Sequence, residues 1–528
     1  MANFERVQQA TGNFGRYQIR VFLATQLAYV AVTGSILCTM YDTLLPDSHI
    51  LNCSLHSLDY FTNDSFRAVL WDSVDFHSLL LELQLFCAHH YVPTFFQTAV
   101  MLGGVVGAVV CGFLADRYGR RPVTIGSLSG CLTMNVVIAV AGALNWSLSA
   151  LFFFVLGFSS GGYMVVNLVL LLEVVGSQYW RLGVTAFNGW PLGLMCMASM
   201  GFFTGYWRWY HLCLAAAAIS CLLPLCLGVH ESARWLVQVG RTEEARQIMV
   251  KVAEINGTSD QLLFDLESKV PVVDTEPGLR LVSTVSPSQQ PVYRTYTYLD
   301  LVKHRRIFVH LLALLYSWLA SSIISFGIYF NMGSLAGNRY LNTFLLGLFK
   351  ALTGLIPFAV ASWVGRKPVL LVAVVVACVS CWAGVAVFLL DRQGADSVVL
   401  TAFSVLGASA IDPIWKVNHL YSTELFPTVV RNMARAVCNT GSRTGSVIAP
   451  QVAYLRNYGA AIPYVIFGVL AVVQLFVCCF FLPETKGQPL PDRLADEEPA
   501  VKFSALSNSD TKGDSAQLTE NSRDNVMK

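Results

Sequence analysis

The stretch Gly112-Phe-Leu-Ala-Asp116-Arg117-Tyr-Gly119-Arg120-Arg121-Pro122 places an acid, three arginines and two glycines between two hydrophobic runs. A shorter copy, Ser362-Trp-Val-Gly365-Arg366-Lys367-Pro368, lies between two apolar runs far downstream, without an acid at the position of Asp116. A polar turn that recurs at matching places predicts a membrane protein built from two similar halves.

The composition places this chain in a lipid bilayer. Of its 528 residues, 55% are hydrophobic and 13% are charged, and the mean hydropathy is +0.54. A soluble domain carries about 25% charged residues. The net charge of +2 is too small to indicate a nucleic-acid partner. The first apolar run begins after Arg20 and has no small-residue cleavage site behind it, so we expect it to be retained as a span.

Twelve apolar segments are long enough to cross a bilayer, which takes roughly 20 residues. They predict an all-α membrane protein with twelve transmembrane helices in two pseudo-symmetric halves. The predicted spans are 18–41, 92–115, 122–144, 147–174, 179–205, 207–229, 307–330, 340–361, 368–390, 398–421, 433–455 and 460–482. The predicted regions are a cytosolic N-terminus at 1–17, a first half at 18–229 with an extracellular loop at 42–91, a cytosolic linker with short helices at 230–306, a second half at 307–482, and a largely disordered cytosolic tail at 483–528.

Lysine and arginine are concentrated in short loops that fall on one side, which predicts cytosolic termini. The loop at 42–91 is then outside, as expected for a plasma-membrane protein, and its sequons predict glycosylation at Asn52 and Asn63. Cys53 and Cys87 lie in the same loop, where a disulfide can form. The loop is also where a homo-oligomer contact could form. In the linker, we expect an amphipathic helix at 242–256 that stops at Asn256-Gly257.

Acids and bases recur at the cytosolic ends of the spans in both halves. Charges that are half-buried need partners, so we interpret these sets as a latch that closes and opens with the cytosolic side. Taken singly, each pair could instead be an ordinary topology signal or helix cap. The predicted gating residues are Gly112, Asp116, Arg117, Gly119, Arg120, Arg121, Glu173, Arg181, Glu231, Arg234, Gly365, Arg366, Glu424 and Arg431.

Several of these motifs resemble a known family. The loop at 112–122 resembles the motif of the major facilitator superfamily. Glu231-Ser-Ala-Arg-Trp-Leu and Tyr421-Ser-Thr-Glu-Leu-Phe-Pro-Thr-Val-Val-Arg-Asn are similar to solute carrier family 22, which includes organic cation, organic anion and carnitine transporters. The resemblance extends to about residue 489. It implies the major facilitator fold and alternating-access transport of small organic ions without ATP.

Two basic residues, Arg443 and Lys350, lie near the middle of predicted spans. Inserting each basic side chain into the middle of a bilayer costs roughly 2.5–3.5 kcal/mol. This cost suggests that each one is neutralised by an anionic substrate or by an acid from another helix. Asp412 is the strongest acidic candidate, and Lys416 follows it at i+4. We therefore expect Asp412 and Lys416 to pair with each other, leaving Arg443 and Lys350 to bind substrate.

The family comparison supports an anionic group on the substrate. Cation carriers of the family have acids at the positions matching Arg443 and Lys350, whereas anion and carnitine-type carriers have arginine at the first. The sequence departs from the family at Phe153, where arginine is usual, and this puts family-typical ion coupling through that position in doubt. Aromatic residues that could line a pocket are Phe326, Tyr329, Phe330 and Trp190.

Glycines spaced by four residues predict close helix contacts, which we expect to be moving interfaces in spans two and eleven and static packing in span four. These pairs are Gly103 with Gly107, Gly157 with Gly161, and Gly441 with Gly445.

The sequence thus predicts a carrier of carboxylate-bearing organic anions that works by exchange or facilitated diffusion. The alternatives are a carnitine-like zwitterion or organic cation carrier, and a non-transporting receptor or scaffold on the same fold. We find no pattern typical of an enzyme, a metal site or a cofactor site. The expected partners are the small organic ion and membrane lipid.

Overall fold

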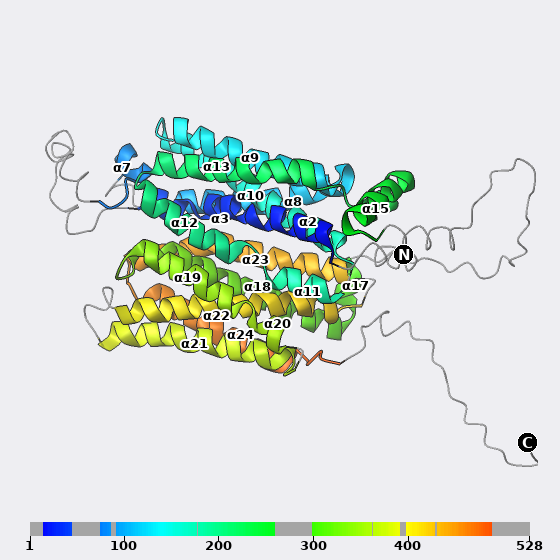
Figure 1. Cartoon of the computed structure of the whole chain (residues 1–528). Helices are drawn as coiled ribbons and strands as arrows, with labels where there is room; N and C mark the ends of the chain where they lie inside the picture. The colour runs from blue at the N-terminus through cyan, green and yellow to red at the C-terminus, as the bar shows by residue number, and fades with distance from the viewer. Residues whose placement is uncertain are drawn as a thin grey trace, which may run out of the picture.

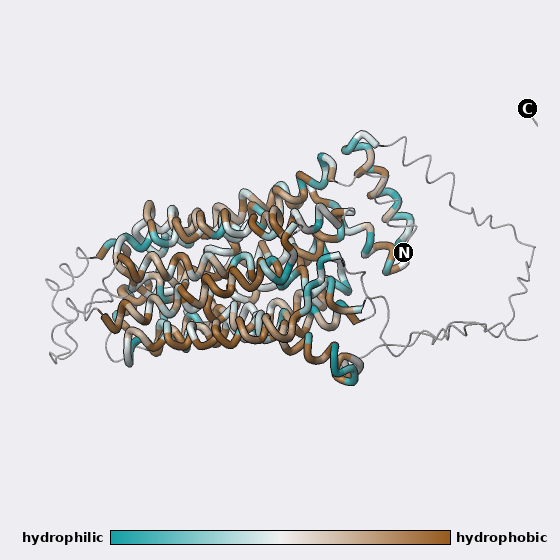
Figure 2. Tube along the Cα trace, turned by 90° about the horizontal axis from the view of Figure 1, so that it is seen from below, coloured by the Kyte–Doolittle hydropathy of each residue, from teal (hydrophilic) through white to brown (hydrophobic). Residues whose placement is uncertain are grey.

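The computed structural model describes residues 14–44, 74–85, 91–176, 178–258, 298–361, 363–390, 398–427 and 430–487. Within these ranges the chain forms a bundle of long helices that run side by side (Figure 1). Hydrophobic residues dominate the length of the bundle (Figure 2). The predicted glycosylation sites Asn52 and Asn63, and the predicted disulfide between Cys53 and Cys87, lie outside the described residues.

The helices follow the predicted spans closely. The first half contains α2 (Arg16–Leu27), α3 (Tyr29–Leu37), α4 (Thr39–Asp42), α7 (Leu79–Leu83), α8 (Val92–Tyr118), α9 (Arg120–Ala141), α10 (Trp146–Val174), α11 (Gln178–Ala186), α12 (Trp190–Thr204) and α13 (Trp207–Gly228). After it come α14 (Ala233–Gln238), α15 (Thr242–Asn256) and α17 (Tyr298–Lys303). The second half contains α18 (Arg305–Asn331), η2 (Met332–Ser334), α19 (Arg339–Thr353), α20 (Ile356–Val360), α21 (Arg366–Leu390), α22 (Val398–Glu424), α23 (Arg431–Tyr454), η4 (Leu455–Asn457) and α24 (Ile462–Phe481).

In the described part of the chain, ten helices are long and apolar enough to cross a membrane. The predicted spans five and eleven are not among these ten helices, and each has a physical reason. Span five is divided into α11 and α12, and α23 carries a polar face along much of its length. A polar face on a spanning helix is tolerated where that helix is covered by other protein segments or lines a cavity.

The amphipathic helix predicted in the linker is confirmed. α15 covers Thr242–Asn256 and ends at Gly257, which has φ 74°. The Asn256 side chain accepts a hydrogen bond from the Tyr17 backbone N–H and donates one to Gln18, so α15 is attached to the first turn of α2. Figure 1 places α15 at one end of the bundle and α7 at the other. We call these the inner end and the outer end.

Gly119 and Gly365 make the two turns of the repeated motif. Their φ angles are 109° and 113°, a backbone conformation that glycine adopts at little cost and other residues avoid. A Cβ on Gly119 would also touch the Glu231 carboxylate, and one on Gly365 would touch that of Glu484. Around Gly112, by contrast, a Cβ would meet no described atom within 4 Å. The fold therefore explains two of the three predicted gating glycines.

The spaced glycines pack helices inside each half. A Cβ added at Gly103 or Gly107 of α8 would meet backbone atoms of α10, and one at Gly157 or Gly161 of α10 would meet those of α8. The pair in α23 lies in the same way against Leu315 and Leu319 of α18. The nearest neighbours of these glycines thus belong to the same half, and the movement expected at spans two and eleven stays a prediction.

The two halves touch toward both ends of the bundle. At the outer end, the ring of Tyr41 stacks on that of Tyr340 with centroids 5.7 Å apart. Toward the inner end, the Lys416 ammonium group donates a hydrogen bond of 2.9 Å to the Thr185 carbonyl. The interface between these contacts is where side chains from both halves meet.

Candidate functional site

An aromatic cluster joins the two halves in the middle of the bundle. Trp190 of α12 lies 6.0 Å from Phe326 and 6.4 Å from Tyr329 of α18, measured between ring centroids. Its indole N–H donates a hydrogen bond of 3.3 Å to the Tyr329 hydroxyl. Phe330 packs beside Phe326 at 6.5 Å. The structure thus brings together the aromatic residues that the sequence singled out.

Lys350 of α19 reaches this cluster, and its ammonium group lies 5.6 Å from the centroid of the Tyr329 ring. It is almost fully buried, with 1% of its surface exposed, and donates a hydrogen bond of 3.0 Å to the Ala408 carbonyl. The Asp412 carboxylate lies 3.8 Å from Lys350 and 3.9 Å from Lys416. The expectation that Asp412 pairs with Lys416 alone and leaves Lys350 free is therefore wrong. Because α19 packs against α22, the Asp412 carboxylate lies within ion-pair distance of both Lys350 and Lys416.

Arg443 of α23 has a different environment. Its Nε atom is buried and has no hydrogen-bond partner among the described residues. The guanidinium interacts electrostatically with the hydroxyl of Tyr29, which belongs to α3 of the first half. The Ser442 carbonyl beside it accepts a hydrogen bond from Ser322 of α18, which fixes this turn of α23. Arg443 thus lies close to the first half, while the turn of α23 that carries it is bonded to α18.

The electrostatic balance of this region is positive. Lys350, Lys416 and Arg443 contribute three positive charges and Asp412 contributes one negative charge, so the formal sum is three minus one, or +2. Charges in a water-poor interior are screened weakly. The four side chains therefore leave an excess of formal positive charge in this region.

The first-half gating residues meet at the inner end. Arg120 forms ion pairs with Asp116 at 3.0 Å and with Glu173 at 3.2 Å. Glu231 accepts hydrogen bonds of 3.0–3.2 Å from the backbone N–H groups of Arg120 and Arg121. These bonds tie α8, α9 and α10 to the segment after α13.

The second half repeats this arrangement. Arg366 forms an ion pair with Glu424 at 3.0 Å. Glu484 accepts hydrogen bonds of 3.0 Å from the backbone N–H groups of Arg366 and Lys367. The Thr485 hydroxyl donates to Glu424 at 2.6 Å. Glu484 stands after span twelve as Glu231 stands after span six, so the recurrence of the acid in the sequence matches the recurrence of the contact.

The other predicted gating residues occupy the same end of the bundle. Arg181 donates to the carbonyl of the residue that follows α10, and Arg431 donates to the carbonyl two residues after α22. Arg117 is exposed, with its guanidinium beside the Tyr118 ring, and Arg234 is half-buried in α14. The ion pairs found here at Arg120 and Arg366 join helices of the same half.

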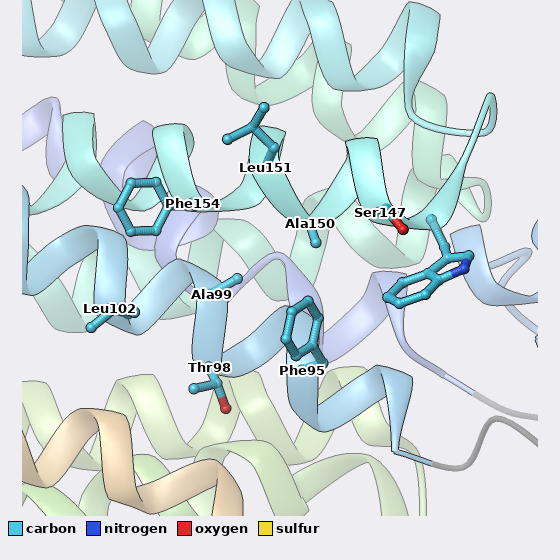
Figure 3. A pocket seen from close by; sticks show the side chains of 9 residues that line it. Phe95, Thr98, Ala99, Leu102, Ser147, Ala150, Leu151 and Phe154 are labelled. Atoms are coloured by element: carbon cyan, nitrogen blue, oxygen red, sulfur yellow. The ribbon is translucent and has the colours of Figure 1, made fainter.

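A cavity of about 360 Å³ lies at the outer end between α8 and α10 (Figure 3). Its walls are almost wholly apolar. Phe95, Leu102 and Leu151 in the lining are also half exposed, as expected for a surface that faces lipid. The nine lining residues are Phe95, Thr98, Ala99, Leu102, Trp146, Ser147, Ala150, Leu151 and Phe154. None of these nine lining residues carries a charged side chain.

Sequence reasoning missed a second buried polar site. Asp42 ends α4 and His211 lies in α13, and the His211 Nε2 atom is 3.1 Å from the Asp42 Oδ2 atom. Both side chains have 0% exposure. The sequence predicts Asp42 as the first residue of the extracellular loop, whereas the structure places it at the end of the first span. An ionisable residue in an apolar span is a signal that could have identified it. The Cys38 thiol lies nearby, but both ring nitrogens of His211 are occupied by side chains, which leaves none for a metal ion.

Comparisons with known proteins agree with this architecture. Residues 87–493 match the family described as "Sugar (and other) transporter". Solute carrier family 22 member 2 from Rattus norvegicus is 30% identical over 429 residues, which cover 80% of this chain and 72% of that protein. A solute carrier family 22 member 15-like protein from Xenopus laevis is 27% identical over 503 residues, covering 94% and 97%.

The fold is similar to that of the xylose transporter XylE from E. coli in its inward-open conformation. The TM-score is 0.62 at 16% identity, covering 90% of this chain and 98% of that one. These relatives are transporters and not enzymes. Together with the helical bundle and its repeated inner-end motif, they show that this chain is a multi-pass membrane transporter of the major facilitator superfamily and belongs to solute carrier family 22.

Proposed function

We propose that this protein carries carboxylate-bearing organic anions across the plasma membrane by alternating access, with both termini in the cytosol. Arg443 binds the carboxylate, and Lys350 adds positive potential. Trp190, Phe326 and Tyr329 hold the organic body of the substrate. The inner-end residues around Arg120 and Arg366 rearrange as the cytosolic side opens.

The unpartnered Nε atom of Arg443 is the observation that carries this proposal. A buried donor without a partner costs about 1–3 kcal/mol. A carboxylate would remove this cost, because arginine can hold both carboxylate oxygens with parallel hydrogen bonds. Lys350 and Lys416 already share Asp412, so the remaining positive charge favours the binding of an anionic substrate.

A zwitterion of the carnitine type is the second candidate. The cluster of Trp190, Phe326 and Tyr329 supports it, because aromatic rings attract quaternary ammonium groups. However, the Lys350 ammonium group already lies over the Tyr329 ring. It would repel a second cation there, so we favour a substrate whose organic body is uncharged.

The membrane potential limits the mode of transport. It acts on each charge with about 2.3 kcal/mol per 100 mV. At about −60 mV, an anion that moved alone would settle roughly tenfold lower inside the cell. We therefore propose exchange against a second anion, or facilitated movement down a gradient.

The extracellular loop completes the proposal. It carries N-linked glycans at Asn52 and Asn63 and a disulfide between Cys53 and Cys87, and it can mediate contact with a second copy of the chain. The outer helices contact membrane lipid.

Uptake into proteoliposomes tests the substrate class. Labelled aromatic carboxylate, carnitine and ergothioneine are compared for the unaltered protein, Arg443→Ala and Arg443→Lys. We expect carboxylate uptake to fall about 100-fold in Arg443→Ala, as for a lost charged hydrogen bond, and to recover partly in Arg443→Lys. Arg246→Ala, on the exposed face of α15, is the matched control. Intact carboxylate uptake by Arg443→Ala would show that the anchor is elsewhere.

A further inference from the structure

We propose that Lys416 is a positioning residue: it holds the two halves together toward the inner end and lets them part when an anion reaches the substrate site. Lys416 belongs to α22 of the second half, and its side chain is buried. We have not given it a part in binding substrate. The inference rests on the proposed function, because it describes how binding at that site is passed to the inner end.

Lys416 caps a helix of the other half. Its ammonium group donates a hydrogen bond of 2.9 Å to the carbonyl of Thr185, the second-last residue of α11. The last four carbonyls of a helix have no partner inside that helix, and a positive charge near them is favourable. The hydrogen bond therefore stabilises the end of α11 only while the two halves stay together.

A pair of aromatic rings lies beside this hydrogen bond. Phe187, which follows α11, lies 6.1 Å from Phe358 of α20, measured between ring centroids. These contacts belong to the packing of α11 against α20 and α22 of the second half (Figure 1). We call the Lys416–Thr185 hydrogen bond and the Phe187–Phe358 ring pair the inner contact. The hydrogen bond is the part of the inner contact that a change in nearby charge can weaken.

Asp412 connects Lys416 to the substrate site. Its carboxylate lies 3.8 Å from the ammonium group of Lys350 and 3.9 Å from that of Lys416. Each lysine donates a shorter hydrogen bond to a backbone carbonyl, that of Ala408 for Lys350 and that of Thr185 for Lys416. The Oδ2 atom of Asp412 is buried and has no hydrogen-bond partner among the described residues. This oxygen can therefore accept a hydrogen bond if one of the lysines moves toward it.

The direction of the Lys416 hydrogen bond distinguishes this role from plain charge neutralisation. Lys416 and Asp412 stand at i+4 and i on one helix, a spacing at which an acid and a base can pair. A lysine that served only to neutralise Asp412 would be expected to hydrogen-bond it. Lys416 donates instead to the other half, so its position couples Asp412 to the inner contact.

An anion beside Lys350 changes the balance at Asp412. It compensates the charge of the lysine and repels the carboxylate, because charges in a water-poor interior are weakly screened. Asp412 then has Lys416 as its main counter-charge. A charge-assisted hydrogen bond between them needs an approach of about 1 Å, from 3.9 Å to the usual distance of about 2.7–2.9 Å. A Lys416 drawn toward Asp412 gives up the Thr185 carbonyl, and the inner contact weakens.

Hydrogen–deuterium exchange of the full-length protein in nanodiscs tests the first step without substrate. The peptide at 178–186 reports on α11, and the peptide at 120–141 reports on α9, which packs mainly within the first half. We expect Lys416→Met to raise exchange in α11 about tenfold, as for the loss of a hydrogen bond from a charged group, and to leave α9 unchanged. Lys416→Arg should restore part of the protection. Lys251→Met, at an exposed position of α15, is the matched control.

Addition of benzoate tests the second step, with benzamide as a neutral molecule of similar shape. We expect benzoate to raise exchange in α11 of the unaltered protein about fivefold or more, and benzamide to have no effect. Lys416→Met should not respond to benzoate, because its inner contact is already weakened. A bound ligand ordinarily stabilises the folded protein and lowers exchange, so a rise confined to α11 is a sharp expectation.

The outcomes separate this inference from the proposed function. Equal α11 exchange in Lys416→Met and the unaltered protein would overturn the inference, and so would a rise of the same size in α9, which would mean a general loss of stability. Benzoate that is taken up by proteoliposomes but leaves α11 exchange unchanged would also overturn it. If benzoate is neither taken up nor active on α11, while Lys416→Met alone loosens α11, the proposed substrate class fails and Lys416 keeps its role in joining the halves.

Discussion

Glu231 and Glu484 occupy equivalent positions in the two halves. Each lies just after the last span of its half and accepts hydrogen bonds from the backbone N–H groups of the first two residues of another helix, α9 or α21. A carboxylate at a helix N-terminus satisfies donors that have no partner inside the helix and interacts favourably with its dipole. The duplication has therefore preserved this contact, although the second loop motif has lost its acid.

The first prediction concerns Glu484. We expect Glu484→Ala to lower the free energy of unfolding by about 1–2 kcal/mol, as the loss of a helix cap does. Thermal unfolding in detergent measures the change. Glu243→Ala is the control, because the Glu243 side chain is 69% exposed on α15. Equal midpoints for the two variants would mean that Glu484 does not support α21.

The second prediction separates the glycines of the repeated motif. Gly119→Ala should destabilise the protein by about 1–2 kcal/mol, because an alanine at φ 109° is strained and its methyl group meets Glu231. Gly112→Ala should be close to neutral, since its Cβ meets no described atom within 4 Å. Unfolding midpoints and uptake rates are compared for the two variants. A larger effect at Gly112 would point to a contact made in another state of the transport cycle.

The third prediction is a pH dependence at the outer end. Burial alone would raise the pKa of Glu82, but hydrogen bonds from Arg208, Trp207 and Tyr206 together outweigh it and hold the pKa below its usual 4.5. A lowered pKa in the folded state adds stability that is present above the unfolded pKa and is lost as pH falls through the folded pKa.

We therefore expect Glu82→Gln to lower the free energy of unfolding by about 1–2 kcal/mol at neutral pH, and the difference to shrink below about pH 4.5. Thermal midpoints at a series of pH values measure it, with Glu243→Gln as the exposed control. A difference that grew in acid would contradict the assignment.

The fourth prediction tests whether Asp412 serves both lysines. Asp412→Asn leaves the Lys350 and Lys416 ammonium groups without a counter-charge, and we expect a loss of about 3–5 kcal/mol. The double variant Asp412→Asn with Lys416→Met should recover part of this loss, because only one buried cation then lacks a partner. Unfolding of Asp412→Asn, Lys416→Met and the double variant, each compared with the unaltered protein, gives the coupling energy. Simple addition of the two single effects would show that Lys416 is independent of Asp412.

Much of the fold could be predicted from local properties. The spans, the amphipathic helix at 242–256 and the turns at Gly119 and Gly365 follow from hydropathy, helix period and turn residues, which are read over a few neighbouring positions. The aromatic cluster could also be anticipated, because Phe326 and Tyr329 share a face of one helix at i and i+3. The sequence predicts one continuous span at 179–205, whereas the structure breaks it between α11 and α12 at Asn188-Gly189, a pair typical of a turn.

The sequence by itself determined that this chain crosses a membrane as two similar halves with charged turns at one end, because apolar length and charge position act locally. Only the tertiary structure decided the partners of the buried charges. Lys350 shares Asp412 with Lys416, Arg443 keeps an Nε atom without a partner, and Asp42 meets His211 across 169 residues of chain. Which helix faces meet depends on how all the helices pack together, and no local pattern records it.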